Sequence, residues 1–282
     1  HDALPISNME FLGIHLDTVS MTMSIPSLKM SEIRDILQVW SEKKRASKLD
    51  VQSLVGKLQF ASRCIRQGRV FIARMLRHLR SLHELPQKRR VALPHFFIKD
   101  VCWWRKFMDE YNGISLIPQL QWSQPDAIFS TDSCLSGCGG ILNIHQRYFH
   151  SIFPNFILDM KLDINSLELL AMVVALKLWG SLLRGYRVQV YCDNAASVAV
   201  VNSGRSRCEF LNSCLREIAY LCATYEIQIH CLHICGSDNR VSDYLSRWHL
   251  EDSYSSKFFD LCGQNMTCSN VQPDMFCFTA DW

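Results

Sequence analysis

The chain has 282 residues, of which 48% are hydrophobic and 20% charged, with a net charge of +3. A chain of this length can form about two domains with buried cores, and this composition excludes disordered, collagen-like and coiled-coil proteins. The longest apolar stretch, residues 167–183, contains Glu168 and Lys177 and is too short to span a bilayer, so no membrane association is expected. No signal peptide is visible, and thirteen cysteines without framework spacing therefore predict reduced thiols in the cytoplasm or the nucleus.

Charge divides the chain into two parts. Residues 1–122 carry 19 Lys and Arg against 11 Asp and Glu, a net charge of +8, whereas residues 123–282 carry 11 against 16, a net charge of −5. A basic part joined to an acidic part predicts one region that binds a polyanion and another that concentrates carboxylates.

In the basic part, the alternating pattern of residues 9–25 predicts a β-hairpin. Helical patterns then cover three segments: residues 27–42, 49–85 and 98–111. A break is expected at Gly68, and residues 112–125 are the best candidate for a linker.

The helix that begins at Arg69 is amphipathic. Its apolar residues fall on one side and its arginines on the other: Arg69, Arg74, Arg77 and Arg80. These four, here called the arginine stripe, are either a solvated helix face or a row of guanidinium groups that follows a phosphate backbone. Trp103 and Trp104, on the next helix, are expected in the core rather than as stacking platforms for bases.

The acidic part has the element order βββαβααβα. Five strands are predicted over residues 127–132, 139–144, 147–153, 187–193 and 226–233. Helices are predicted over residues 165–184, 195–202, 209–225 and 240–248. This order predicts an α/β domain with a mixed five-stranded sheet, in which an antiparallel meander is extended by parallel strands through helical crossovers.

Acidic residues occupy special places in this domain. Asp132 ends the first strand and Asp193 ends the fourth, so both lie at one sheet edge if these strands are parallel neighbours. Glu168 lies opposite the polar residues of its helix and therefore faces the sheet, where a carboxylate needs a partner or a metal ion. The alternative for Glu168 is an acid favoured by the helix dipole. Asp243 lies on the last helix.

Carboxylates that converge repel one another unless cations neutralise them. Their oxygen ligands favour Mg²⁺ or Mn²⁺, and two such ions activate water for phosphodiester hydrolysis. A zinc site is a weaker interpretation, because Cys134-x3-Cys138 and Cys231-x3-Cys235 lack the two-residue gap of a zinc knuckle. We expect these cysteines to be small buried hydrophobic residues.

Four segments of the acidic part resemble the ribonuclease H domain of retroelement reverse transcriptases: STDSCLSGCGGIL, INSLELLAMVVAL, VYCDN and HICGSDNRVSDYLSR. The resemblance implies a ribonuclease H-like fold over residues 123–250. It implies four metal-binding catalytic acids, Asp132, Glu168, Asp193 and Asp243, and a catalytic histidine, His233. It also implies substrate binding near Ser133, Asn165, Asn194 and Asn239. Cys235 and Ser242 depart from the family pattern, which has Pro and Ala at these places.

The basic part resembles the end of a reverse transcriptase, in the segments EFLGIHLD and LVGKLQFASRCIRQGRVFIARML. The resemblance is to the DIRS and Ngaro type of retroelement, which encodes a tyrosine recombinase. It implies the end of the polymerase palm over residues 1–26, a helical thumb- or connection-like region over residues 27–122 and an unassigned tail over residues 251–282. The chain has no Asp-Asp dipeptide, so DNA synthesis is not expected. Its implied partners are the missing fingers and palm and a downstream tyrosine recombinase.

The sequence therefore predicts a nuclease that uses two Mg²⁺ ions, with Mn²⁺ as a substitute, and cleaves the RNA strand of RNA–DNA hybrids to leave 3′-hydroxyl and 5′-phosphate ends. The arginine stripe would hold the duplex. Two alternatives remain: an inactive nucleic-acid-binding remnant of a retrotransposon polyprotein, and another nuclease on the same fold, such as an integrase or exonuclease.

Overall fold

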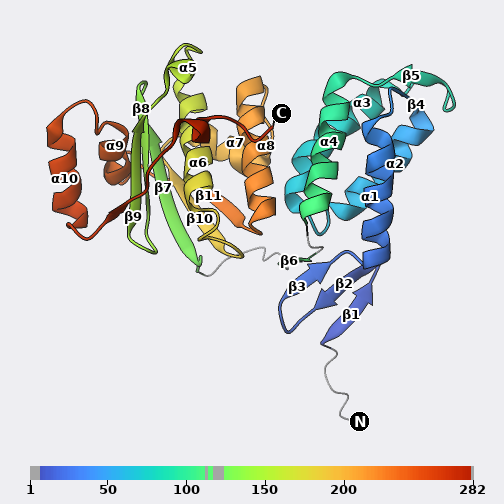
Figure 1. Ribbon diagram of the computed structural model, residues 1–282, viewed down its shortest axis with the longest axis horizontal. Helices are drawn as coiled ribbons and strands as arrows, with labels where there is room; N and C mark the ends of the chain where they lie inside the picture. Colours follow the sequence, from blue (N-terminus) through green and yellow to red (C-terminus); the bar gives the residue numbers. More distant parts are fainter. Residues whose placement is uncertain (1–6, 112–113, 117–123, 281–282) are drawn as a thin grey trace, which may run out of the picture. The chain divides into compact units, whose positions relative to one another are not determined.

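The computed structural model describes residues 7–111, 114–116 and 124–280. The chain forms two compact units that divide near residue 120 (Figure 1). Among the described residues, no helix combines the length and apolar character that a membrane crossing requires.

The first unit contains a small antiparallel sheet with the strand order β1-β2-β3-β6. Its strands are β1 (Asn8–Phe11), β2 (Ile14–Asp17), β3 (Thr22–Ser24) and β6 (Ile114–Leu116). Leu12 and Gly13 both have positive φ between β1 and β2, as a tight two-residue hairpin turn requires. The predicted hairpin over residues 9–25 therefore has a third strand. The predicted linker supplies β6, which pairs with β3, whereas its residues 112–113 and 117–123 lie outside the described residues.

Helices form the larger part of the first unit. They are α1 (Ser27–Ser41), α2 (Lys48–Ala61), the 3-10 turn η1 (Arg66–Gly68), α3 (Arg69–Ser81) and α4 (His95–Glu110). Two short strands, β4 (Arg45–Ser47) and β5 (Arg90–Ala92), pair antiparallel. Trp103 and Trp104 are 1% and 0% exposed, as the sequence predicts. The predicted helix over residues 49–85 breaks after Ala61 rather than at Gly68, which leads directly from η1 into α3. Glycine is required at position 68 because a Cβ there would lie 2.3 Å from the Trp104 ring.

The second unit is a mixed α/β domain around a six-stranded sheet with the order β11-β10-β7-β8-β9-β12. Its strands are β7 (Ala127–Ser133), β8 (Gly137–Leu142), β9 (Arg147–Ile152), β10 (Arg187–Cys192), β11 (Gln228–His233) and β12 (Thr267–Cys268). β7, β8 and β9 form the predicted antiparallel meander, and β10 and β11 add in parallel beside β7. β12 pairs parallel with β9, so the sheet has one strand more than the predicted five.

Helices cover both faces of this sheet (Figure 1). They are α5 (Asn155–Leu158), α6 (Ile164–Trp179), α7 (Ala195–Ser203), α8 (Glu209–Thr224), α9 (Arg240–Ser246) and α10 (Asp252–Cys262). Side chains alternate along β7: Phe129 contacts Trp179 of α6, whereas the Ser130 hydroxyl contacts that of Ser242 on α9 at 2.7 Å. Since alternate residues of a strand point to opposite faces, Asp132 lies on the α9 side with Ser130.

Glycine allows α9 to approach the sheet closely. A Cβ at Gly139 of β8 would lie 2.3 Å from the Leu245 Cβ and 2.8 Å from the Ser246 backbone nitrogen. The register places Gly139 directly opposite Asp132. The contact therefore brings the last turn of α9 next to Asp132.

Residues 251–282, which the sequence left as an unassigned tail, contain a helix, a short strand and a 3-10 turn. α10 packs against α9. Its buried Phe258 also contacts Tyr148 of β9, with 4.6 Å between the two ring centroids. The chain then adds β12 and the 3-10 turn η2 (Pro273–Phe276). Further on, the Thr279 backbone N–H donates to the Glu217 Oε2 of α8 at 2.9 Å. Most of this segment is therefore an integral part of the second unit.

Candidate functional site

Four carboxylates from four separate elements line one pocket of about 560 Å³. They are Asp132 of β7, Glu168 of α6, Asp193 after β10 and Asp243 of α9. β7 and β10 are parallel neighbours, so Asp132 and Asp193 lie at one sheet edge, as the sequence predicts.

Asp132 is held by a hydroxyl of α9. The Ser246 Oγ donates a hydrogen bond to Asp132 Oδ2 at 2.5 Å and lies 3.0 Å from the Asp243 carbonyl oxygen. Ser246 is completely buried, and Asp132 is 5% exposed. Burial raises the pKa of Asp132 to about 7, assisted by the negative charges of Asp193 and Asp243 and opposed by the Ser246 hydrogen bond. Ionising this carboxyl therefore requires compensation by positive charge.

Glu168 is the most buried of the four acids at 3% exposed, which confirms that it faces the sheet. Its Oε1 accepts a hydrogen bond of 3.2 Å from the Ser133 backbone N–H, and its Oε2 lies 3.8 Å from the Cys192 sulfur. Burial, followed by the charges of Asp132 and Asp193, raises the pKa of Glu168 to about 9. A helix dipole explains a carboxylate in the first turn but not one in this position, so the alternative interpretation is not supported.

Asp193 lies at the start of a polar network. Asn194 caps α7, since its Oδ1 accepts from the Ser197 backbone N–H at 2.9 Å. Its Nδ2 donates to Asn165 Oδ1 at 2.8 Å. His233 Nε2 lies 3.1 Å from the Asp193 carbonyl oxygen. Of these residues, Asp193 and Asn194 line the pocket, whereas the half-buried Asn165 and the exposed His233 are outside its lining.

Two of the predicted substrate-binding residues make contacts that position other parts of the site. Asn239 is 2% exposed, and its Nδ2 donates to the Thr131 carbonyl oxygen at 3.1 Å. The amide therefore ties the start of α9 to β7, and substrate binding by Asn239 stays a prediction. Ser133 lines the pocket, but its Oγ donates to the Leu167 carbonyl oxygen at 3.0 Å. Ser133 thus fixes the start of α6 and, through its N–H, the Glu168 carboxylate.

The sequence did not identify three residues that contact the acids of the site: Cys192, Ser246 and Arg247. The Arg247 Nε lies 2.7 Å from Asp243 Oδ1, and the residue lines the pocket. Ser246 and Arg247 follow Asp243 at the three- and four-residue spacing that places side chains on one helix face. That spacing in the segment DYLSR was the signal for both. Cys192 precedes Asp193 directly, and only the fold shows that its sulfur faces Glu168.

The donor set of the pocket suits a hard divalent cation. Ligand atoms of Glu168, Asp193 and Cys192 lie within 4.8 Å of one another, and the carboxylates of Asp132 and Asp243 line the same space. Burial and mutual repulsion raise the pKa values of two of the four carboxyl groups, Asp132 and Glu168, so a bound cation would favour their ionised forms. Carboxylate oxygens in this number fit Mg²⁺ or Mn²⁺.

The cysteine pairs do not form a zinc site. Cys231 is 1% exposed in the core, whereas Cys235 lies at the surface. Cys138 is completely buried in β8. Every cysteine in the described part of the chain carries a free thiol, as a reduced protein would.

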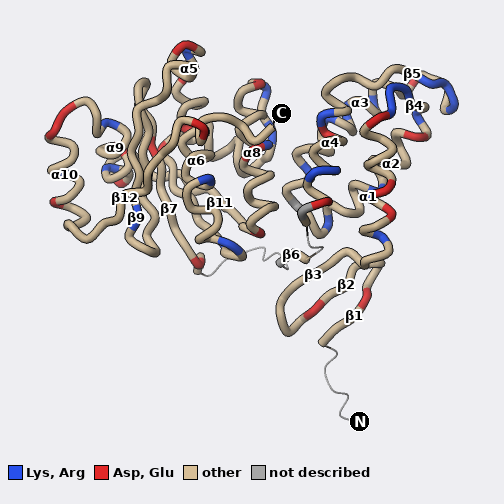
Figure 2. Tube along the Cα trace, viewed as in Figure 1, with Lys and Arg blue, Asp and Glu red and all other residues tan. Residues whose placement is uncertain are grey.

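The arginine stripe of the first unit is not uniform. Arg69, Arg77 and Arg80 are exposed, but Arg74 pairs with the carboxylate of Asp100, whose side chain is 1% exposed. The guanidinium of Arg74 therefore faces α4, unlike those of the three exposed arginines, and phosphate binding by Arg74 stays a prediction. Figure 2 shows other Lys and Arg residues near β4 and β5.

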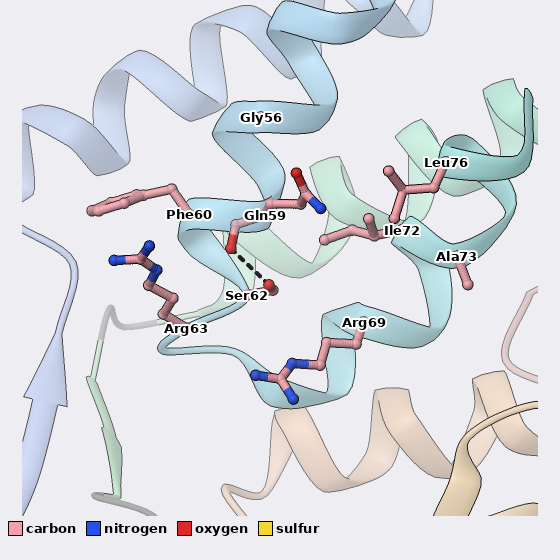
Figure 3. Close-up of a pocket in the computed structure, with 9 residues that line it drawn as sticks. All are labelled: Gly56, Gln59, Phe60, Ser62, Arg63, Arg69, Ile72, Ala73 and Leu76. Atoms are coloured by element: carbon pink, nitrogen blue, oxygen red, sulfur yellow. Dashed lines mark hydrogen bonds between the residues drawn. The ribbon is translucent and has the colours of Figure 1, made fainter. Parts of the chain in front are cut away.

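A pocket of about 660 Å³ lies between α2 and α3 in the same unit (Figure 3). Two guanidinium groups, of Arg63 and Arg69, lie at one end of it, and Ile72 and Leu76 form an apolar wall. Arg63 was not part of the predicted stripe, because it precedes α3 and follows α2. The pocket offers two cations beside an apolar surface.

No family model and no curated protein matches the chain. Solved structures with some likeness are of the foamy viral protease-reverse transcriptase. One, titled as "dRH" in complex with double-stranded DNA, has 16% identity and a TM-score of 0.29 and covers 82% of this chain and 39% of that one. A second, with RNA/DNA hybrid, has 14% identity and a TM-score of 0.28 and covers 80% and 29%. A third, with double-stranded DNA, has 15% identity and a TM-score of 0.28 and covers 82% and 46%. This chain thus spans less than half the length of each, and this likeness identifies no family.

Proposed function

We propose that the chain is a nuclease that requires Mg²⁺ or Mn²⁺ and cleaves the RNA strand of RNA–DNA hybrids. The observation that carries this proposal is the convergence of four carboxylates on one pocket, two of them more than nine-tenths buried. A protein that only bound nucleic acid would gain nothing from this cluster, because carboxylates repel phosphates. The four sequence segments that resemble ribonuclease H support the choice of substrate.

Each acid has a distinct place in the proposed site. Asp132, Glu168, Asp193 and Asp243 would hold the cations, which would supply Lewis acidity for attack of water on a phosphodiester. The Ser246 hydroxyl donates to Asp132 Oδ2 and so fixes the orientation of this carboxyl group. Ser133 orients Glu168 in the same way through its backbone N–H. Arg247 balances part of the negative charge of Asp243.

The first test is cleavage of an end-labelled RNA–DNA hybrid by the full chain. We expect the RNA strand to be cut in Mg²⁺ or Mn²⁺, to leave 5′-phosphate ends and to remain intact in EDTA. RNA–RNA and DNA–DNA duplexes are the controls: the first carries 2′-hydroxyl groups on both strands and the second on neither, so cleavage of the hybrid alone would show the expected selectivity. A chain that folds and binds hybrid but never cuts it would contradict the proposal and favour the inactive remnant.

Exposed arginines of the first unit would bind the duplex backbone. We expect Arg77→Glu to weaken hybrid binding and to reduce the slope of log affinity against log salt by roughly 1. Arg184→Glu, at an exposed position in the turn that follows α6, is the charge-matched control. Fluorescence anisotropy over a range of salt concentrations measures both. Unchanged affinity and slope in Arg77→Glu would show that the stripe is a solvated face.

Arg74→Ala should lower the stability of the protein, whereas Arg77→Glu should lower its affinity for hybrid. It removes the guanidinium from the buried Asp100 carboxylate, and breaking a buried ion pair on one side costs about 3–5 kcal/mol. Thermal unfolding should therefore show a lower melting temperature, with hybrid affinity unchanged in the folded protein. A loss of hybrid affinity without a loss of stability would show that Arg74 binds phosphate.

The retroelement origin remains a proposal that rests on the sequence resemblance alone. On this proposal the polymerase fingers and palm, and a tyrosine recombinase of the DIRS and Ngaro type, would be partners of the chain. Its place in the cytoplasm or nucleus is likewise proposed from its cysteines and its proposed substrate.

A further inference from the structure

Two basic runs of the first unit, remote from each other in the sequence, meet where β4 and β5 pair antiparallel. The register places Arg45 opposite Ala92 and Ser47 opposite Arg90. Figure 2 shows Lys and Arg gathered at these two strands. The basic side chains that this pairing brings together, here called the basic ribbon, are Lys43, Lys44, Arg45, Lys48, Lys88, Arg89 and Arg90.

The two strands pack through one face and present cations on the other. Ala46 is completely buried and lies opposite the half-buried Val91. Successive residues of a strand point to opposite faces, so Arg45 and Arg90 point away from this pair, and both are exposed. The Arg45 Nη2 also donates to the Arg90 carbonyl oxygen at 3.1 Å. The backbone beneath the cations is therefore already ordered, and a ligand would not have to order it.

Most of the charge of the basic ribbon has no acid beside it. Asp50 Oδ2 lies 3.9 Å from Lys43 Nζ, whereas Lys48 Nζ donates to the uncharged carbonyl oxygen of His83 at 2.9 Å. Residues 43–50 and 88–92 carry seven Lys and Arg against one Asp, a net charge of +6, whereas the whole of residues 1–122 carries +8. Within the described part of the chain, three members are exposed and form no ion pair: Lys44, Lys88 and Arg89.

The composition of this surface suits the phosphate backbone of a nucleic acid. Concentrated positive charge attracts a polyanion. The exposed side chains of residues 43–48 and 88–92 are those of Lys, Arg and Ala92, so the surface offers no large apolar group for insertion into a bilayer. It also presents no aromatic ring on which a base could stack. Contacts would therefore be made to phosphates and would carry no sequence information.

We propose that the basic ribbon binds the phosphate backbone of a nucleic-acid duplex, independently of base sequence. The carboxylates of the candidate site repel phosphates, so the chain needs positive charge elsewhere to retain a substrate of this kind. The surface is argued from charge and strand register, whereas its role in holding an RNA–DNA hybrid for cleavage rests on the proposed nuclease function.

Duplex binding by the full chain in EDTA tests the surface without any cleavage. Fluorescence anisotropy over a range of salt concentrations gives the affinity and its salt dependence. The variant that combines Lys44→Gln, Lys88→Gln and Arg89→Gln should bind at least about tenfold more weakly, and its slope of log affinity against log salt should fall by roughly 3, because each phosphate contact contributes about 0.9. The loss should be equal for RNA–DNA hybrid and double-stranded DNA of the same length.

Two further variants control for charge and for folding. The first removes three exposed cations of the second unit that lie outside the carboxylate pocket, and should bind with nearly the original slope: Lys161→Gln, Arg184→Gln and Lys257→Gln. The second is for the case in which circular dichroism shows the ribbon variant unfolded. Lys88→Gln with Arg89→Gln, in the turn before β5, should then lower the slope by roughly 2.

The binding data have defined contrary outcomes. An unchanged affinity and slope in the folded ribbon variant, or in the double variant that replaces it, would overturn the proposal. Vesicles of equal parts phosphatidylserine and phosphatidylcholine test the other polyanionic surface. If the ribbon variant loses binding to these vesicles but keeps its affinity for duplex, the partner is an anionic membrane and the proposal fails.

Cleavage separates this proposal from the proposed nuclease function. If hybrid is cut, the ribbon variant should have a raised KM and an unchanged kcat, because the carboxylates belong to the second unit. If hybrid is cut and the ribbon variant binds like the original chain, the ribbon proposal fails and the nuclease function stands. If no hybrid is cut but the ribbon variant loses duplex binding, the nuclease function fails and the ribbon proposal stands.

Discussion

Replacing Asp132 by Asn is expected to reduce hybrid cleavage at least about a thousandfold, which corresponds to roughly 4 kcal/mol of lost transition-state stabilisation. The substitution keeps the size of the side chain, and the Asn carbonyl oxygen can still accept the hydrogen bond from Ser246. The fold should therefore be retained. What is lost is a negative charge at the centre of the pocket, where it would balance bound cations.

Cleavage rates at saturating hybrid, with circular dichroism to show that the variant is folded, measure this effect. Asp260→Asn is the matched control, because Asp260 is an exposed acid of α10 outside the pocket. We expect the control to cleave at the rate of the original chain. Residual cleavage within tenfold of that rate in Asp132→Asn would exclude Asp132 from the catalytic centre, and the four-carboxylate proposal would then fail.

The positions of three acids could be predicted from periodicity and element order. The helical repeat directs Glu168 to the sheet and uses only neighbours within a few residues. The shared edge of Asp132 and Asp193 also required the first and fourth strands to be parallel neighbours, which the order of the elements suggests. The structure confirms these placements, while the metal-binding and catalytic roles of the acids stay predictions.

Contacts between remote segments could not be predicted in this way. The helical repeat placed Arg74 correctly on the face opposite the apolar residues, but nothing local shows that Asp100, which lies 26 residues away, approaches that face. The contact between Cys192 and Glu168, which lie 24 residues apart, also has no local signal. A periodic pattern gives the direction of a side chain and not the residue that it meets.

The last segment of the chain escaped prediction for another reason. β12 has two residues and η2 has four, so neither is long enough to show a period. Their conformation is set by the surface they cover, as where Phe276 is buried against Phe153. Such short elements depend on tertiary packing more than on their own propensity.

Replacing Glu168 by Gln is expected to stabilise the metal-free protein near neutral pH and to abolish its stabilisation by Mg²⁺. Burial raises the pKa of Glu168 from 4.5 to about 9. Below pH 4.5 the carboxyl is protonated in both the folded and the unfolded chain and contributes no pH dependence. As the pH rises above 4.5, the unfolded chain ionises while the folded one keeps its proton, so the folding stability falls until the pH passes about 9.

Glutamine has nearly the same shape and no charge to lose. The variant should therefore lack this fall, and at pH 7 its free energy of unfolding should exceed that of the original chain by about 2 kcal/mol or more. For a domain of this size, that raises the melting temperature by roughly 4–8 °C. Near pH 4 the two proteins should have equal stability. Scanning calorimetry in EDTA at several pH values measures the difference.

Saturating Mg²⁺ should reverse the order of the two proteins at pH 7. A cation that binds only the folded state stabilises it by mass action, and in the original chain it also displaces the protons from the buried carboxyl groups. The variant has lost a ligand and should gain little. Glu209→Gln, at the exposed start of α8, should follow the original chain in both conditions. If Mg²⁺ stabilises Glu168→Gln as much as the original chain, Glu168 binds no cation. If the variant is less stable than the original chain in EDTA at pH 7, the Glu168 carboxylate stabilises the fold.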